Sequence, residues 1–134
     1  MAIKKLDNLI DQARKIPKKR VIAVFAQDDA TILATKRAVD LNFAEFTLIG
    51  DEKIMTQICL DHDIDPSIYT IINEQDELAA GHKAMRLLSD GKGEALMKGL
   101  ISTDKLLKCM LDKEYGLAIP NATLSSISIA EIPN

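Results

Sequence analysis

The chain has no tryptophan, and its aromatic residues are limited to three Phe and two Tyr among 134 residues. The core must therefore be aliphatic, built from Ile, Leu, Val, Ala and Met. Proline and glycine are also scarce, at 4 and 6 residues, whereas 47% of residues are hydrophobic and 28% are charged. This balance excludes collagen-like, low-complexity and disordered chains. A chain of this length can bury the core of one ordinary domain, and we expect residues 1–134 to form one.

Long apolar runs and paired cysteine motifs are missing as well. No uninterrupted apolar run approaches the roughly 18–20 residues that a membrane helix needs. The amino-terminal segment MAIKKLDNLI lacks the apolar centre of a signal peptide, so we expect a cytoplasmic protein. Cys59 and Cys109 belong to no CxxC pair and to no zinc-ligand spacing. We therefore expect two buried, reduced thiols and no metal site.

The net charge of −3 argues against nucleic acid as the main partner. The densest basic cluster consists of Arg14, Lys15, Lys18, Lys19 and Arg20. We interpret it as a solvated helix end, because cations are favoured at the carboxyl terminus of a helix. The alternative is a patch that attracts anions.

Apolar runs rich in β-branched residues alternate along the chain with segments of helical periodicity. A run without polar interruption, such as residues 21–26, is typical of a strand covered on both faces in a parallel sheet. Strands are predicted near 21–26, 46–49, 69–72 and 94–97. Helices are predicted from Leu6 to Ile16, from Asp28 or Asp29 to Leu41, after Gly50-Asp51, from Asn73-Glu74 to Asp90-Gly91, and from Ser102-Thr103 onward. This alternation predicts βαβ units and an α/β three-layer sandwich with a mostly parallel sheet.

The carboxyl-terminal segment has a different pattern. Residues 117–123 contain Pro120 and Asn121, which interrupt regular structure. Within residues 124–132, apolar and polar side chains alternate with a period of two over part of the segment. Such alternation predicts an exposed or antiparallel edge strand.

Ligands of an open parallel sheet bind outside the carboxyl ends of its strands. Here these positions are 27–29, 50–51, 73–74 and 98–103, and the last is the most informative. Gly99 permits close approach of the backbone, and Ser102 and Thr103 lie where a helix begins and its amides point outward. With Lys98 and Lys105 nearby, the segment predicts a site for phosphate. The alternative is that Ser102 only caps the helix and Lys98 is a surface lysine; the nucleotide-binding signatures GxGxxG and GxxxxGK[ST] are absent.

The two histidines carry weaker signals. His82 falls on a helical segment between apolar residues, which favours a partly buried structural role over a catalytic one. His62 lies among Asp61, Asp63 and Asp65, which suggests a metal, but adjacent side chains on a turn point in different directions. A solvated acidic turn is the better interpretation, and no Ser-His-Asp set can be assigned from spacing.

The run that contains Lys98 also resembles a known family. LMKGLIST (residues 96–103), LLK (106–108) and DKEYGL (112–117) together are similar to the LMKGL-(I/V)-(S/N)-T…LDKE-(Y/V)-GL stretch of phosphate butyryltransferases. Phosphate acetyltransferases have a looser version. AVFAQD (23–28) and LIGD (48–51) resemble the family's first and second strands with their turns, and the similarity extends over residues 19–117.

The resemblance implies reversible acyl transfer between coenzyme A and inorganic phosphate, giving acyl phosphate and free CoA. It implies no metal or prosthetic group, a fold like that of isocitrate and isopropylmalate dehydrogenases, and a site in a cleft between two α/β domains. Ser102 and Thr103 match the family's hydroxyl pair near the phosphate. Lys108 stands where acetyltransferases carry an arginine that helps to bind CoA, which keeps the charge but loses the bidentate fork. Phosphate- or CoA-binding residues are thus Lys98, Gly99, Ser102, Thr103 and Lys108, and the catalytic residues are unassigned.

The sequence departs from the family pattern in two respects. The family's second domain, which carries the general base and further arginines, has no counterpart in these residues. The family's GLRTG…LSH also becomes a segment with Ala118 in place of the arginine and Ser126 in place of the histidine. We therefore expect one wall of the cleft of a phosphate acyltransferase, associating as a homo-oligomer; the alternative is an inactive binding or assembly domain of the same fold.

Overall fold

The computed structural model describes residues 5–114 and Ala130, and its centre is a sheet of four strands. The strands lie in the order β3-β2-β1-β4, and every neighbouring pair is parallel. The register places Val24 beside Ile49 on one side and beside Lys98 on the other. The strands are β1 (Lys19–Val24), β2 (Ala44–Gly50), β3 (Thr70–Asn73) and β4 (Ala95–Lys98).

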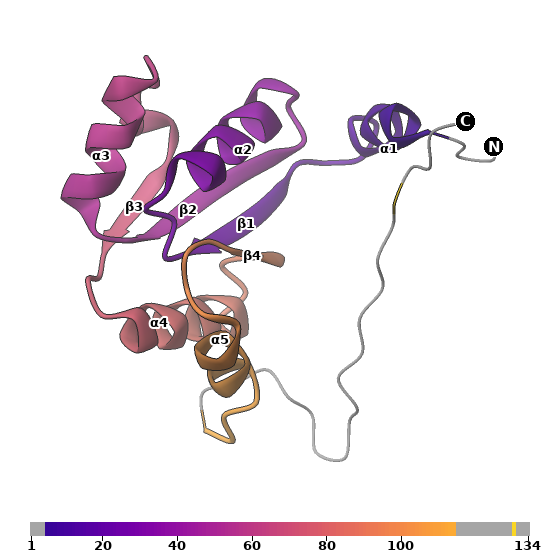
Figure 1. Ribbon diagram of the computed structural model, residues 1–134. Coiled ribbons are helices and arrows are strands. Elements are labelled where there is room, and N and C mark those ends of the chain that lie inside the picture. Colours follow the sequence, from indigo (N-terminus) through magenta and orange to yellow (C-terminus); the bar gives the residue numbers. More distant parts are fainter. Residues whose placement is uncertain (1–4, 115–129, 131–134) are drawn as a thin grey trace.

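Helices connect the strands and cover both faces of the sheet, so the predicted α/β sandwich with its parallel sheet is confirmed (Figure 1). One pair of helices, α2 and α3, lies over one face, and the pair α4 and α5 lies over the other. The helices are α1 (Leu6–Ala13), α2 (Asp29–Asp40), α3 (Glu52–Asp61), α4 (Glu77–Ser89) and α5 (Thr103–Met110), with a short 3-10 helix η1 (Pro66–Ile68) before β3.

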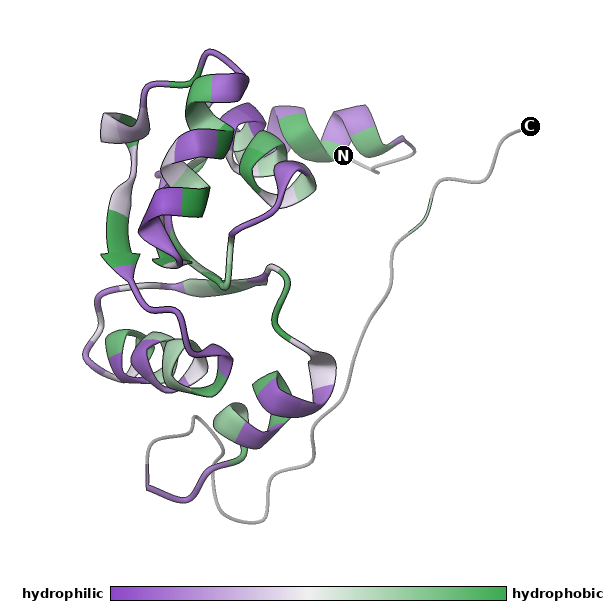
Figure 2. Cartoon of the chain, turned by 60° about the vertical axis from the view of Figure 1, so that its left-hand side comes forward, coloured by the Kyte–Doolittle hydropathy of each residue, from purple (hydrophilic) through white to green (hydrophobic). Residues whose placement is uncertain are grey.

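Alternate residues of β1, one of the two inner strands, belong to two separate cores. In β1, Ala23 packs with α2 and α3, whereas Ile22 and Val24 pack with α4 and α5. All three are at most 1% exposed. This explains why the strand is apolar at consecutive positions, since both of its faces are covered. Helices α2 to α5 each bury residues against the sheet, and they combine hydrophilic and hydrophobic residues along their length (Figure 2).

Four of the helices begin at a short polar side chain that accepts a backbone hydrogen bond. Asp28 caps α2, Asp51 caps α3, Asp76 caps α4 and Ser102 caps α5. Each cap satisfies at least one of the amides that have no partner within the helix, and Asp51 accepts from two, those of Lys53 and Ile54. The sequence predicted the starts of α2, α3 and α5, whereas α4 begins at Glu77 rather than at the predicted Asn73-Glu74.

The limits of the first helix and first strand differ from the prediction. Helix α1 ends at Ala13 rather than near Ile16, and β1 begins at Lys19 and ends at Val24. The strand starts early because the Lys19 amide donates to the Phe43 carbonyl. It stops early because Phe25 has a left-handed φ of 56°. The basic cluster is therefore divided between two elements. Arg14 is the C-cap of α1, whereas Lys19 and Arg20 begin β1. Lys19 Nζ and Arg20 Nε lie 3.9 and 3.8 Å from the Glu94 carboxylate.

The remaining predictions divide between confirmed and untested. Cys59 and Cys109 are buried free thiols, as predicted. Burial raises the pKa of both thiols. Among the described residues, no helix has both the length and the apolar character needed to span a membrane. The edge strand predicted at 124–132, and the departures at Ala118 and Ser126, lie outside the described residues.

Candidate functional site

The strand order identifies the carboxyl ends of β1 and β4 as the candidate site. The chain builds β1, β2 and β3 outward in one direction and then returns to place β4 on the other side of β1. Helix α2, which follows β1, packs on one face, and α5, which follows β4, packs on the other. Where connections diverge to opposite faces in this way, a crevice opens outside the carboxyl ends of the two strands. Residues 25–29 and 98–103 directly follow these two strand ends and therefore lie at the expected ligand position.

The turn from β4 into α5 lies directly against the end of β1. The Gly99 amide donates to the Val24 carbonyl at 2.9 Å, and the Leu100 amide donates to the Phe25 carbonyl at 2.8 Å. A Cβ at position 99 would lie 2.7 Å from the Val24 carbonyl oxygen, and closer still to that of Phe25. Because both obstacles are backbone atoms, only glycine allows this approach. Gly99 thus allows a close backbone approach, as predicted, and the backbone that it approaches is that of Val24 and Phe25.

The two predicted hydroxyl residues lie at the start of α5, with Ser102 as the N-cap and Thr103 as the first helical residue. The Ser102 hydroxyl accepts from the Lys105 amide at 3.3 Å. Ser102, Thr103 and Lys105 are all exposed. The structure thus brings together a helix amino terminus, two hydroxyls and a lysine, as the sequence predicted.

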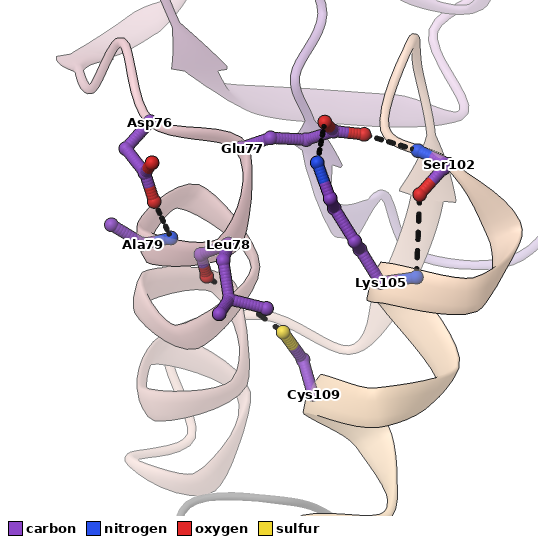
Figure 3. A network of polar contacts seen from close by, with 7 residues as sticks. All are labelled: Asp76, Glu77, Leu78, Ala79, Ser102, Lys105 and Cys109. Carbon is purple, nitrogen blue, oxygen red and sulfur yellow. Dashed lines mark hydrogen bonds and ion pairs between the residues drawn. The ribbon is translucent and has the colours of Figure 1, made fainter.

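A residue that the sequence did not single out also occupies this corner. The Glu77 carboxylate, from the first turn of α4, accepts from the Ser102 amide at 2.5 Å through Oε1 (Figure 3). Its Oε2 lies 2.6 Å from Lys105 Nζ. Lys105, and then the Ser102 amide, hold the pKa of Glu77 below its ordinary value, and Glu77 raises the pKa of Lys105. Nothing local in the sequence points to Glu77, since it reaches α5 only through the packing of the two helices.

The other two predicted residues lie apart from the helix start. Lys98 is the last residue of β4, is exposed, and its Nζ is 3.4 Å from the Gly99 carbonyl. Lys108 lies in the last turn of α5, five positions beyond Thr103. A helix rises about 1.5 Å per residue, so Lys108 could contact a different part of a ligand from the part held at Ser102.

Polar side chains connect the other carboxyl-end loops to one another. The Gln27 Oε1 accepts from the Asp51 amide at 2.7 Å, and the Asn73 Oδ1 accepts from the Glu52 amide at 3.0 Å. A cavity of about 540 Å³ lies beside this second contact, next to the carboxyl end of β3. Its lining is Glu52, Lys53, Thr56, Gln57, Asn73 and Gln75. Of these, only Asn73 belongs to the strand ends that the sequence singled out.

The histidines are placed as expected. His82 lies in α4, is partly exposed, and lines a cavity of about 310 Å³ with Ala79, Lys83 and Arg86. His62 follows α3, and its Nε2 is 3.7 Å from the Asp29 carboxylate. Within the described part of the chain, no three His, Cys, Asp or Glu side chains are arranged to hold a metal ion.

Known proteins with similar sequences identify the relatives of this chain. It is 35% identical over 114 residues to the phosphate butyryltransferase of Clostridium beijerinckii and 32% identical over 129 residues to that of Clostridium acetobutylicum. It is 36% identical over 129 residues to the phosphate acetyltransferase of Thermotoga maritima. The chain is related to the phosphate acetyl/butyryltransferases. These alignments take in 85%, 96% and 96% of this chain.

The phosphate acetyl/butyryltransferase relatives are longer proteins. The chain spans 38% of the length of the C. beijerinckii protein, 42% of that from C. acetobutylicum and 43% of that from T. maritima. No family model matches the sequence. The resemblance noted in the sequence is thus confirmed, and it concerns 38% to 43% of the length of these relatives.

Solved structures of phosphotransacylases share the fold. A phosphotransacetylase from Streptococcus pyogenes superposes with a TM-score of 0.67 at 15% identity, covering 83% of this chain and 42% of that one. A branched-chain phosphotransacylase from Enterococcus faecalis V583 gives 0.56 at 21% identity, covering 69% and 33%. At these identities the likeness concerns the fold alone.

Proposed function

We propose that this chain forms one wall of the active-site cleft of a phosphate acyltransferase, which interconverts acyl-CoA plus phosphate with acyl phosphate plus CoA. The observation that carries the proposal is the position of residues 98–103, whose motif resembles that of the butyryltransferases. This motif lies at the point where the connections of β1 and β4 diverge, which is the expected ligand position in a parallel sheet. The acyl group is acetyl or butyryl, as in the named relatives.

In this proposal, phosphate binds at the start of α5. The first amides of the helix and the hydroxyls of Ser102 and Thr103 donate to phosphate oxygens, and Lys98 and Lys105 supply positive charge. Gly99 keeps the turn against β1 so that these donors face the crevice. Lys108, farther along α5, contacts a phosphate group of CoA.

The reaction itself needs no redox change. A phosphate oxygen attacks the thioester carbonyl carbon, the C–S bond breaks, and the CoA thiolate leaves and takes up a proton; acyl phosphate retains the acyl group. The groups in this wall hold and orient phosphate, which favours reaction by proximity. The proposal assigns the general base to no described residue and includes no metal or prosthetic group.

A direct test follows the binding of phosphate at the start of α5. Titration with inorganic phosphate should shift the amide resonances of Ser102 and Thr103, and these shifts should disappear in a Ser102→Ala/Thr103→Val double variant. Ser89→Ala, at the far end of α4, is the matched control and should behave like the unaltered chain. An absence of response at Ser102 and Thr103 at high phosphate would refute the site.

The second candidate is a catalytically inactive binding or assembly domain with the same fold. It is favoured by Ala118 and Ser126, which replace the family's arginine and histidine. Release of free CoA thiol from butyryl-CoA or acetyl-CoA in the presence of phosphate distinguishes the two. Phosphate-dependent release above background supports the enzyme and contradicts the inactive domain.

We further propose that the protein is cytoplasmic and associates with itself, as a homodimer. Exposed apolar side chains support self-association, since Leu60, Leu100 and Leu111 are each more than half exposed. Light scattering should give a mass above the 14.8 kDa of one chain, and a monomer at high concentration would exclude the dimer.

A further inference from the structure

The start of α5 already holds a carboxylate from elsewhere in the chain. Glu77 contacts the Ser102 amide and the Lys105 ammonium with its two oxygens, at 2.5 and 2.6 Å. These partners are 25 and 28 residues away in the sequence, so the contact depends on how α4 and α5 pack. In Figure 3 the Glu77 side chain crosses from α4 toward the first turn of α5.

We propose that Glu77 is an internal competitor for anions at the start of α5 and thereby sets the affinity of this corner for phosphate. The inference rests on the proposed function, which places phosphate at the same helix start. A phosphate there would use the Ser102 amide and the Lys105 ammonium, and one carboxylate engages both. Hydrogen bonds from an amide or an ammonium group to a carboxylate are stronger than those between neutral groups, so Glu77 competes effectively with phosphate. Phosphate reaches both donors only when Glu77 turns away.

The Glu77 side chain can turn away without any change in the backbone. It belongs to the first residue of α4, and its side chain is 23% exposed, so solvent lies beside it. Turning the carboxylate into water would free the two donors and leave both helices in position.

The two helices are joined independently of Glu77. Gly81 of α4 lies against Cys109 of α5, where an added Cβ would be 2.6 Å from Cys109 Sγ. Cys109 Sγ is also 3.7 Å from the Leu78 carbonyl oxygen. Gly81 and Cys109 are both buried and neither contacts Glu77 in these interactions, so we expect this contact to hold α4 against α5 when the Glu77 carboxylate is absent. A substitution at Glu77 should therefore leave the fold intact.

The sharpest variant is Glu77→Gln. It keeps an oxygen that can accept from the Ser102 amide and removes the charge that holds Lys105. Asp76 and Asp104 remain as the nearby acidic residues, and Lys98 and Lys105 as the basic ones. Interactions between a charge and a helix terminus have modest energies, so we expect phosphate to bind about two- to fivefold more tightly. Glu45→Gln, which removes the same charge near the amino end of β2, should leave the affinity unchanged.

The experiment is a phosphate titration of the unaltered chain, Glu77→Gln and Glu45→Gln, followed by the amide resonances of Ser102 and Thr103. In the unaltered chain, the resonance of the Glu77 side-chain carboxyl carbon is followed as well. That resonance should shift in step with Ser102, because phosphate displaces the carboxylate. This second measurement needs no variant and therefore tests the inference even if Glu77→Gln fails to fold.

The outcomes separate this inference from the proposed function. Equal phosphate affinity in Glu77→Gln and the unaltered chain, or a shift at Ser102 with none at the Glu77 carboxyl carbon, would overturn the competitor while leaving the phosphate site standing. An absence of any response at Ser102 and Thr103 in all three proteins would refute the phosphate site, and the competitor with it.

A double-mutant cycle then tests the proposed role of Lys105. If Glu77 acts by engaging Lys105, the gain from Glu77→Gln should shrink in a Lys105→Gln background. A gain of the same size in both backgrounds would contradict competition through Lys105.

Discussion

At the scale of single residues, one polar pair is buried within the aliphatic core between the sheet and α2. Thr35 is fully buried and Tyr69 is 7% exposed. Their hydroxyl oxygens lie 2.9 Å apart, and Thr35 Oγ1 also donates to the Ile32 carbonyl at 2.8 Å. Burial raises the pKa of Tyr69. The pair thus satisfies two buried hydroxyls.

Replacing Thr35 by Val should expose the cost of an unsatisfied hydroxyl. The Tyr69 hydroxyl would keep only the Ile32 carbonyl, at 3.5 Å. We expect the free energy of unfolding, measured with urea, to fall by about 1–2 kcal/mol. In a Tyr69→Phe background the same substitution should cost less, because no hydroxyl is left without a partner. Equal losses in both backgrounds would mean that the hydrogen bond contributes nothing.

At the scale of elements, the turn between β4 and α5 depends on the end of β1. The Phe25 backbone turns to a φ of 56° and presents its carbonyl to Leu100, while Gly99 fits against Val24. A left-handed conformation is costly for a bulky residue, and the surrounding hydrogen bonds hold it in place. The turn that carries the candidate site is therefore specified by two strands together.

Replacing Gly99 by Ala should disturb this turn. The new Cβ would collide with the carbonyl oxygens of Val24, the last residue of β1, and of Phe25, which follows it, and these backbone atoms cannot easily move. We expect a loss of about 1–3 kcal/mol in the free energy of unfolding and a weaker response of Ser102 to phosphate. Leu100→Ala is the control, because that side chain is 55% exposed and should tolerate truncation. A stable Gly99→Ala variant with normal phosphate response would show that the turn stands farther from β1.

At the scale of the whole molecule, three glutamates link distant elements through carboxylate contacts. Glu77 reaches α5, Glu94 accepts from the Arg20 amide at 2.9 Å, and Glu74 lies 3.1 Å from Lys83 Nζ. The pKa of each is held below the ordinary value of 4.5: by Lys105 for Glu77, by the Arg20 amide for Glu94 and by Lys83 for Glu74. A lowered pKa in the folded state means that ionised carboxylates stabilise the fold.

The stability of the molecule should therefore decline in acid. Above pH 4.5 the three glutamates are ionised in both states, and their contribution is complete. As the pH falls below 4.5, the unfolded chain takes up protons first, so the contribution is lost progressively as the pH passes through the lowered pKa values. Urea unfolding between pH 3 and 7 should show a shallower decline in a Glu74→Gln/Glu77→Gln/Glu94→Gln variant. Glu45→Gln is the control, and an unchanged slope in the triple variant would contradict the assignment.

Much of this architecture can be read from the sequence because the signals are local. The apolar run at 21–26 predicts a strand covered on both faces, and Asp28, Asp51 and Ser102 mark the starts of helices. Such signals depend on the few residues around each position and on the period of the backbone. The resemblance of residues 96–103 to the butyryltransferases is local in the same sense, so the family could be recognised without coordinates.

What only the tertiary structure decided depends on residues far apart in the chain. The sequence gives no strand order, so it could not place β4 beside β1 or show that Gly99 fits against Val24 and Phe25. Nor could it show that Glu77 occupies the start of α5, where the sequence predicted only open donors for an anion. The physical reason is that periodicity fixes which face of an element is buried, whereas the partner on that face is chosen by the packing of the whole chain.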